Sequence, residues 1–424
     1  MKQQGKIHIV GIDLENAAGE IVIPQSALGN CAAIIGTDRF LKALPSGNSL
    51  IDNCERIAIT PLQNALTVAC DKQQNGKDAV VLASGDPLLY GIARKLIQLV
   101  GIENTTVYPA VSSIQLAFSR FGIPWDDAKF ISLHGRTEIN YLGKILSSDK
   151  SAILTDGSHR AEIIASNICS FLGADQTRFT LHVAENIGLE DERIFSGSPE
   201  EVRRESFGSL SVVIVVKNDC NTKNSHTIEN NCPYSFGLRE QDIEHSRGLI
   251  TKHEVRAAAL HLLQIPDNSI FWDVGAGSGS VGLEAARMHT DTLVYSIEKN
   301  QEQHQNILTN REKFGLTNLQ LIKGSAPVSL QGLPKPDRIF IGGSGGNLSD
   351  IITFCNEALT GQGLMVVTAV LDKTREMAPE IMHKCGLKVD MHTISVTRSS
   401  YPERVENSLN PITIIVGRKQ ARKE

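Results

Sequence analysis

Long runs of apolar residues are missing from this sequence. Its longest apolar runs are the length of single strands, such as Val212–Val216 and Leu364–Val367, whereas a membrane-spanning helix needs about 20 such residues. The first residues lead directly into a strand pattern, without the apolar core of a signal peptide. We therefore expect a cytoplasmic protein with no membrane partner.

Paired cysteine motifs are also absent. The eight cysteines are scattered, and none forms a C-x-x-C motif. Without a secretory signal, free thiols are expected rather than disulfides. The closest approach to a metal-ligand cluster is Cys220, His226 and Cys232, which lie in a polar, linker-like stretch. We therefore predict no metal site.

Strong positive charge is lacking, because the net charge is −5. This balance disfavours nucleic acid as a partner, and an anionic substrate would have to be met by local positive charge. The length of 424 residues favours two or three domains.

The most informative stretch is Ser269–Ser280. An apolar strand, Ile270–Val274, runs into glycines at 275, 277 and 279, and a helical pattern follows. Glycine tolerates positive φ and lets a ligand approach the backbone, and the following helix offers free N–H groups. The pattern therefore predicts a ligand-binding turn in a parallel sheet.

An acidic residue ends the next predicted strand, Leu293–Ile297. This residue, Glu298, lies nineteen positions after Gly279, a spacing at which a carboxylate can accept both hydroxyls of a ribose. The glycines read G-x-G-x-G rather than G-x-G-x-x-G, so a pyrophosphate cradle is less natural. The sequence therefore favours S-adenosylmethionine over a nicotinamide dinucleotide.

The first half contains two successive α/β units, Lys6 to about Pro109 and about Val111 to Lys217. In the first unit, Gly85 and Asp86 form a turn at the carboxyl end of a strand, and a helix is expected to begin at Pro87. Further along, Ser112 and Ser113 precede a helical pattern, where they could cap the helix or offer hydroxyls to a ligand.

The second half is expected to start with a helix capped by a Thr251–Glu254 capping box. A second glycine cluster, Gly342–Gly346, ends another strand and could let a bulky substrate approach the backbone. Residues 394–398 and 411–417 are predicted to close the sheet as an antiparallel pair.

Four motifs give the first half a resemblance to the tetrapyrrole methyltransferases, and more narrowly to the subgroup acting at C5 of precorrin-6: S-G-D-P-L-L-Y-G, A-V-S-S-I-Q-L-A-F, L-T-D-G-S-H-R and A-E-N-I-G-L-E-D-E-R-I. The resemblance implies a two-lobed fold that holds S-adenosylmethionine between its lobes. By motif position, the cofactor would contact Gly85, Asp86, Leu89, Ser112 and Ser113. The opening loop, G-I-D-L-E-N-A-A-G, lacks the proline and later glycines usual in that family.

The second half resembles the decarboxylating precorrin-6 C15-methyltransferases, through G-L-I-T-K-H-E-V-R, W-D-V-G-A-G-S-G-S, S-I-E-K-N, K-G-S-A-P, D-R-I-F-I-G-G-S and N-P-I-T-I-I. This resemblance implies an α/β protein of the Rossmann-like, seven-stranded class I methyltransferase fold. The implied cofactor-binding residues are Thr251, Gly275, Ala276, Gly277, Ser278, Gly279, Glu298 and Ala326.

Together the resemblances imply methylation of a precorrin-6 tetrapyrrole at C5 and C15, with decarboxylation, in cobalamin biosynthesis. They imply a C5 domain over 1–217, a linker over 218–240, a C15 domain over 241–424 and a homo-oligomer. No residue is assigned to catalysis. Clamps for the substrate carboxylates are predicted at Arg247, Lys252, Arg256, Arg398 and Arg404. The alternatives are C15 activity alone beside a degenerate first domain, and an RNA or protein methyltransferase.

Overall fold

The computed structural model describes residues 5–13, 21–134, 140–218 and 235–419. The candidate zinc ligands at 220, 226 and 232, most of the opening loop and much of the predicted linker lie outside these residues. The chain divides into two compact units. The first comprises 1–137, 149–170 and 174–218, and the second comprises 138–148, 171–173 and 219–424.

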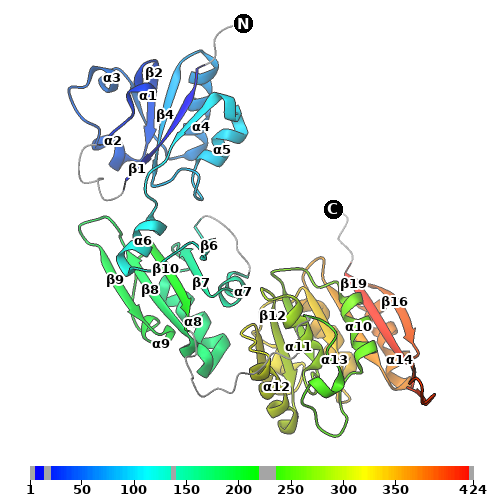
Figure 1. The fold of residues 1–424 in the computed structure, drawn as a ribbon. Helices are drawn as coiled ribbons and strands as arrows, with labels where there is room; N and C mark the ends of the chain where they lie inside the picture. The colour runs from blue at the N-terminus through cyan, green and yellow to red at the C-terminus, as the bar shows by residue number, and fades with distance from the viewer. Residues whose placement is uncertain (1–4, 14–20, 135–139, 219–234, 420–424) are drawn as a thin grey trace. The chain divides into compact units, whose positions relative to one another are not determined.

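The first unit contains two five-stranded sheets (Figure 1). The amino-terminal sheet has the order β3-β2-β4-β1-β5, and all its strands are parallel. Its central strands β1 and β4 are mostly buried, as expected for a parallel sheet covered on both faces, whereas the edge strand β3 is mostly exposed. Its elements are β1 (Ile7–Ile12), α1 (Gln25–Leu28), β2 (Cys31–Gly36), α2 (Asp38–Lys42), α3 (Ser49–Asp52), β3 (Glu55–Ala58), α4 (Leu62–Gln74), β4 (Asp78–Ser84), α5 (Ala93–Val100), η1 (Ile102–Asn104) and β5 (Thr105–Tyr108).

The second sheet of this unit is mixed and has the order β6-β7-β10-β8-β9. Its central strand, β10, has an almost entirely buried sequence, S-V-V-I-V-V-K, and pairs antiparallel with both neighbours. Its elements are α6 (Ser113–Phe121), β6 (Lys129–Ser132), β7 (Lys150–Leu154), α8 (Ala161–Leu172), η2 (Gly173–Arg178), β8 (Phe179–Glu185), β9 (Arg193–Gly197), α9 (Pro199–Val202) and β10 (Ser211–Lys217).

The second unit is built on one seven-stranded sheet of order β13-β12-β11-β14-β15-β19-β16. Its first five strands are parallel, and β19 runs antiparallel to β15 and β16. Its elements are α7 (Tyr141–Leu146), η3 (Glu240–Asp242), α10 (His253–Leu263), β11 (Ile270–Val274), α11 (Ser280–Met288), β12 (Leu293–Glu298), α12 (Gln301–Lys313), β13 (Leu319–Lys323), η4 (Val328–Leu330), β14 (Arg338–Ile341), α13 (Leu348–Ala358), β15 (Leu364–Ala369), α14 (Asp372–Lys384), β16 (Leu387–Ile394), β17 (Thr397–Ser399), β18 (Glu406–Ser408) and β19 (Ile412–Lys419). The predicted α/β class and the seven-stranded sheet are confirmed.

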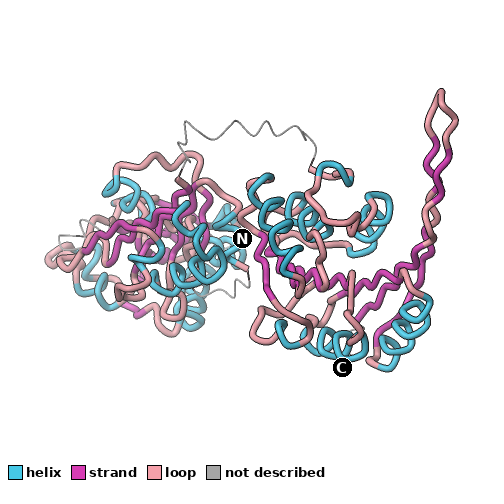
Figure 2. Tube along the Cα trace, turned by 90° about the horizontal axis from the view of Figure 1, so that it is seen from below, coloured by secondary structure: helices cyan, strands magenta, loops and turns pink. Residues whose placement is uncertain are grey.

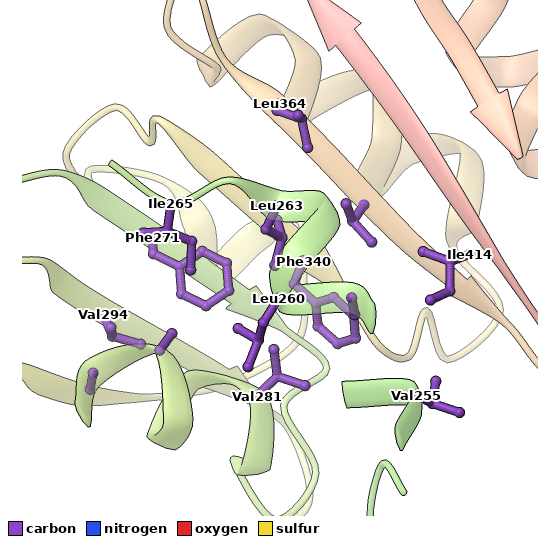
Figure 3. Close-up of a cluster of buried hydrophobic side chains, with 14 of the residues drawn as sticks. Val255, Leu260, Leu263, Ile265, Phe271, Val281, Val294, Phe340, Leu364 and Ile414 are labelled. Atoms are coloured by element: carbon purple, nitrogen blue, oxygen red, sulfur yellow. The ribbon is translucent and has the colours of Figure 1, made fainter. Parts of the chain in front are cut away.

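The main core of the second unit lies between α10, α11 and one face of this sheet. Figure 3 shows Phe271 and Phe340, from neighbouring strands, facing Leu260 and Leu263 of α10. All four side chains are at most 4% exposed. This packing fixes β11 beside β14, and so fixes the loops that follow both strands.

Three local predictions were wrong. The helix expected at Pro87 begins only at Ala93. The α10 cap is Lys252, which makes no side-chain capping bond, so no Thr251–Glu254 capping box forms. The antiparallel partner of β19 is Leu387–Ile394 rather than 394–398.

Residues 397–399 instead pair with 406–408 in the β17–β18 hairpin. Figure 2 shows this hairpin as a long ribbon that extends beyond the helices of its unit.

Cysteines 31, 54, 70, 169, 355 and 385 are free, as predicted. No helix among the described residues is long and apolar enough to span a membrane.

Truncating Phe340 tests the inferred core. Its side chain is 1% exposed, so Phe340→Ala should destabilise the second unit by about 3–5 kcal/mol, through lost burial and a residual cavity. Chemical denaturation followed by circular dichroism measures the change. Val405→Ala, at a position 62% exposed on the hairpin, should have little effect. Equal losses in the two variants would contradict this description of the core.

Candidate functional site

The glycine turn after β11 adopts a backbone that other residues rarely tolerate. Gly275, Gly277 and Gly279 have φ values of 67°, 56° and 75°. A Cβ at Gly275 would lie 2.3 Å from the carbonyl oxygen of Gly343. The turn after β11 and the glycine loop after β14 therefore touch backbone to backbone, which explains why glycine is required at 275.

The Glu298 carboxylate organises the same turn from the end of β12. Its Oε2 accepts a hydrogen bond from the Gly277 N–H at 2.8 Å. Its Oε1 accepts from the backbone N–H groups of Lys299, at 2.9 Å, and Asn300, at 2.8 Å. A carboxylate offers about four acceptor positions, so these three hydrogen bonds leave one position, on Oε2. Glu298 can therefore hold the turn and still accept from a ligand.

A cavity of about 190 Å³ lies beside these groups, and we call it the Glu298 cavity. It is lined by Gly275, Ile297, Glu298, Lys299, Gly324, Ser325, Ala326, Gly343, Ser344, Gly345 and Ile351. It thus brings the ends of β11, β12, β13 and β14 to one edge of the sheet, which is where open α/β sheets bind ligands. Three predicted cofactor residues, Gly275, Glu298 and Ala326, share this cavity. Thr251, Ala276, Gly277, Ser278 and Gly279 are not among its lining residues, although Gly277 bonds to Glu298 directly.

Asp273, at the end of β11, is completely buried behind the turn. Its Oδ2 accepts from the Gly282 N–H at 2.9 Å, and its Oδ1 has no hydrogen-bond partner among the described residues. Burial raises the pKa of Asp273 to about 7. The Gly282 hydrogen bond opposes this shift, and the charge of Glu298 adds to it. The carboxyl group therefore links the turn to the first residues of α11 at a cost in desolvation.

The first unit has a larger cavity of about 390 Å³, which we call the Asp86 cavity. Its lining residues come from the ends of strands in both sheets and from the starts of α2 and α6: Arg39, Ser84, Asp86, Leu89, Tyr90, Gly91, Ser112, Ser113, Ser132, His134, Leu154, Thr155, Asn186, Ile187, Leu189, Ser209, Leu210, Ser211 and Val212. Its volume lies within the usual range of small-molecule sites. Four of the five predicted cofactor residues line it, namely Asp86, Leu89, Ser112 and Ser113.

The fifth residue, Gly85, shapes this cavity without lining it. Its φ is 61°, and a Cβ there would lie 2.9 Å from the Cα of Ser112. Ser112 caps α6 in a capping box with Gln115, so its hydroxyl is already bonded within the protein. Ser113 lines the same wall and is the better placed of the two serines to offer a hydroxyl to a ligand.

Backbone strain also gathers around the Asp86 cavity. Tyr90 and Asn186 line it with φ values of 57° and 51°, which non-glycine residues seldom adopt. The hydroxyl of Tyr90 donates to the Phe130 carbonyl oxygen at 2.6 Å, and the amide of Asn186 donates to Asp191 at 2.7 Å. Strained residues held in this way are typical of functional sites.

Arg256 was wrongly predicted as a substrate clamp. Its side chain is 0% exposed and pairs with Glu284, which is 1% exposed. The guanidinium also donates to the carbonyl oxygens of Leu238 and Thr251. Since Glu284 in turn accepts from the backbone N–H of Leu238, Arg256 fastens the segment before α10 to α11 and cannot reach a substrate.

Arg398 is also engaged within the protein. Its guanidinium donates to both oxygens of Glu254, at 2.8 Å, and to Glu240, at 2.9 Å. Burial alone would raise the pKa of Glu240, but hydrogen bonds from Arg398 and His253 lower it to about 2. Glu240, His253 and Glu254 have the spacing of metal ligands, yet a guanidinium already supplies the positive charge there.

The other predicted substrate residues are more accessible, but none lines the Glu298 cavity. The Arg247 side chain is 79% exposed and lies 3.4 Å from Glu302. Arg404 is exposed and lies between the strands of the β17–β18 hairpin. Lys252 caps α10.

Two cavity cations went unrecognised in the sequence. Lys299 follows Glu298 directly in the S-I-E-K-N motif and lines the same cavity, so its position was a usable signal. Arg39 lines the Asp86 cavity from α2, and no motif marks it.

The class of protein is defined by two family models. The model described as tetrapyrrole (corrin/porphyrin) methylases matches residues 25–203, and the model described as a precorrin methyltransferase domain matches residues 242–416. The first matched range contains the lining of the Asp86 cavity except for Ser209–Val212, and the second contains the whole lining of the Glu298 cavity. The protein is a methyltransferase of the tetrapyrrole class.

Full-length similarity identifies the family. The chain is 31% identical over 393 residues to a precorrin-6Y C(5,15)-methyltransferase (decarboxylating) from a Sinorhizobium species, which covers 92% of this chain and 90% of the relative. The chain therefore belongs to the precorrin-6Y C(5,15)-methyltransferase family. A probable cobalt-precorrin-6B C(15)-methyltransferase (decarboxylating) from Pyrobaculum calidifontis is 35% identical, over 43% of this chain and 96% of its own.

Among solved structures, a precorrin-6Y C5,15-methyltransferase structure from Geobacter metallireducens is 35% identical. It covers 44% of this chain and 97% of its own, with a TM-score of 0.43.

The buried Arg256–Glu284 pair generates a stability prediction. Arg256→Met should destabilise the protein by about 3–5 kcal/mol, because it leaves the Glu284 carboxylate buried without its cation. Urea denaturation measures the loss. The control Lys252→Met, four positions earlier, should change stability by no more than about 0.5 kcal/mol. The double variant Arg256→Met/Glu284→Leu should recover much of the stability that Arg256→Met loses. An Arg256→Met protein as stable as the wild type would return this residue to the candidate substrate contacts.

The raised pKa of Asp273 predicts how stability depends on pH. Since this pKa is about 7 in the folded protein and about 3.9 in an unfolded chain, the folded state binds more protons between these values. The stability that Asp273 contributes is therefore present below about pH 4 and is lost as the pH rises to about 7. Asp273→Asn should remove that decline, measured by urea denaturation at pH 5 and pH 8. Asp149→Asn, at a side chain 91% exposed, is the control, and an unchanged pH profile in Asp273→Asn would refute the assignment.

Proposed function

We propose that this chain methylates a precorrin-6 tetrapyrrole at C5 and C15 and removes one acetate carboxylate as CO2, with S-adenosylmethionine as methyl donor. One observation supports this most strongly. Each unit has its own cavity, and each cavity includes residues at the cofactor motif positions of the matching family. Two separate sites are what two methylations of one macrocycle at different carbons require.

The ribose end of the donor fits the Glu298 cavity by its chemistry. The donor has vicinal ribose hydroxyls, and the acceptor position that remains on Oε2 of Glu298 can accept from one of them. It carries no phosphate, and among the described lining residues there is no cluster of positive charge that a phosphate would need. We assign Gly275, Glu298 and Ala326 to direct contact, and Thr251, Ala276, Gly277, Ser278 and Gly279 to the surrounding turn and its support.

We assign the second donor site to the Asp86 cavity, with Gly85 shaping the wall and Asp86, Leu89, Ser112 and Ser113 along it. The volume of about 390 Å³ supports an active first unit. The alternative of C15 activity alone is therefore less favoured, although the altered opening loop lies outside the described residues.

When bound, the sulfonium donor supplies an electrophilic methyl group, and the reduced macrocycle supplies the carbon nucleophile. The protein mainly has to align the two partners and exclude water. The residues assigned here bind and orient, and we assign no general base. The domain limits 1–217 and 241–424, and a homo-oligomeric assembly, are part of the same proposal.

Product masses test the assignment of activities. The wild-type protein should add two methyl groups to a precorrin-6Y substrate and release one CO2. Gly85→Ala should lower C5 methylation, because its Cβ collides with the start of α6, whereas Glu298→Ala should give a product with one added methyl and every carboxyl group retained. Loss of decarboxylation in Gly85→Ala, with its retention in Glu298→Ala, would reverse the assignment.

Calorimetric titration with S-adenosylmethionine tests the ribose contact in the intact chain. Glu298→Ala should weaken one of two binding events by roughly 1.5–3 kcal/mol, the value of a hydrogen bond to a charged group, and should leave the other unchanged. Glu302→Ala, at a partly exposed acid in the first turn of α12, is the matched control. Two unchanged affinities in the Glu298 variant would exclude it as the ribose acceptor.

A further inference from the structure

A second cavity in the second unit adjoins the Glu298 cavity, and we call it the Lys373 cavity. Its volume is about 260 Å³, and the two cavities share Ser344 as a lining residue. Its walls are the loop after β14 and the first turns of α13 and α14. A group in this cavity would thus lie next to whatever occupies the Glu298 cavity.

The lining of the Lys373 cavity combines apolar surface with single charges. Leu348, Leu371 and Met377 contribute apolar surface, while Lys373 and Asp350 contribute one charge of each sign. Leu371 is 68% exposed, and its neighbour Val370 is 66% exposed. The volume falls below the usual range for a whole small-molecule ligand, so the cavity suits one edge of a larger ligand, an apolar ring with an acidic arm.

Two lysines flank the shared loop, one in each cavity. The ammonium group of Lys299 lies over Gly345, so closely that a Cβ at that glycine would come within 2.5 Å of it. Neither the Lys299 ammonium nor the Lys373 ammonium forms an ion pair with a residue in the described part of the chain. By contrast, Arg256 and Arg398 are already paired with glutamates.

We propose that the Lys373 cavity receives one edge of the tetrapyrrole acceptor, and that Lys373 and Lys299 pair with carboxylates of its side chains. This inference rests on the function proposed above and places the acceptor site of the second unit. It also replaces Arg256 and Arg398 as carboxylate partners in this unit.

The placement meets the geometric requirement of methyl transfer. Donor and acceptor must lie side by side with their reacting atoms aligned, and adjoining cavities with one shared wall allow this. The apolar surface of Leu371 and Val370 can cover the ring, while the two lysines lie where acidic arms can reach them. An ammonium on a flexible stem suits carboxylates that differ in position around a macrocycle.

Steady-state kinetics of the full chain test the proposal, with precorrin-6Y as probe and CO2 release as readout. Lys373→Met should raise KM about tenfold with kcat little changed, as loss of one charged hydrogen bond predicts. Lys299→Met should act similarly, and Leu371→Glu should also raise KM, by adding a like charge. Lys335→Met, at an exposed lysine before the amino end of β14, should change nothing.

The outcomes separate this inference from the proposed function. Calorimetry should show the same S-adenosylmethionine affinities in Lys373→Met as in the wild type. If wild-type protein releases no CO2 from the probe, the proposed function fails. If the wild type is active while Lys373→Met and Leu371→Glu both keep the wild-type KM, the Lys373 cavity is not the acceptor site. A fall in kcat alone would likewise overturn a binding role for Lys373.

Discussion

The second unit depends on the junction of two glycine loops, closed by one carboxylate. Gly275 and Gly343 meet so closely that neither loop could keep its position if residue 275 had a side chain. Glu298 then holds the first loop through the N–H of Gly277. Three parallel strands therefore end in a fixed arrangement, and the Glu298 cavity is the space that this arrangement leaves beside them.

The same constraint explains the burial of Asp273. An ionisable group without a full set of partners is destabilising inside a protein, yet Asp273, the fourth of the five residues of β11, is completely buried. A Cβ at Gly282 would come within 2.8 Å of its Oδ2 and 2.7 Å of the Ser296 hydroxyl. The contact between β11, β12 and the start of α11 is therefore close, and a carboxyl group that bonds to the Gly282 N–H is what joins them. Positions of this kind sacrifice stability to define a site.

The sequence was a good guide wherever a short-range rule was sufficient. Apolar runs located most strands, and the G-x-G-x-G turn with Glu298 identified one edge of the second sheet. It failed where the outcome depended on residues distant in sequence. The pairing of β19 with Leu387–Ile394 depends on competition between two segments of similar pattern. The starts of α5 and α10 depend on backbone geometry before each helix, which a lone proline or threonine does not determine.

The residues proposed to contact the substrate were even harder to predict from the sequence. From sequence, Arg256 and Lys373 are equivalent, since each is a cation near the start of an amphipathic helix. Only the fold shows that Glu284 and Leu238 enclose one of them, whereas the other faces a cavity between two helix starts. A charged side chain is available to a ligand only if no protein group of opposite charge already pairs with it. Separating a buried ion pair costs far more free energy than an exposed lysine gains by pairing with a ligand carboxylate. This is why we propose Lys299 and Lys373 as partners of a polyacidic acceptor: both line cavities beside the second glycine loop, and neither ammonium is in an ion pair within the described part of the chain.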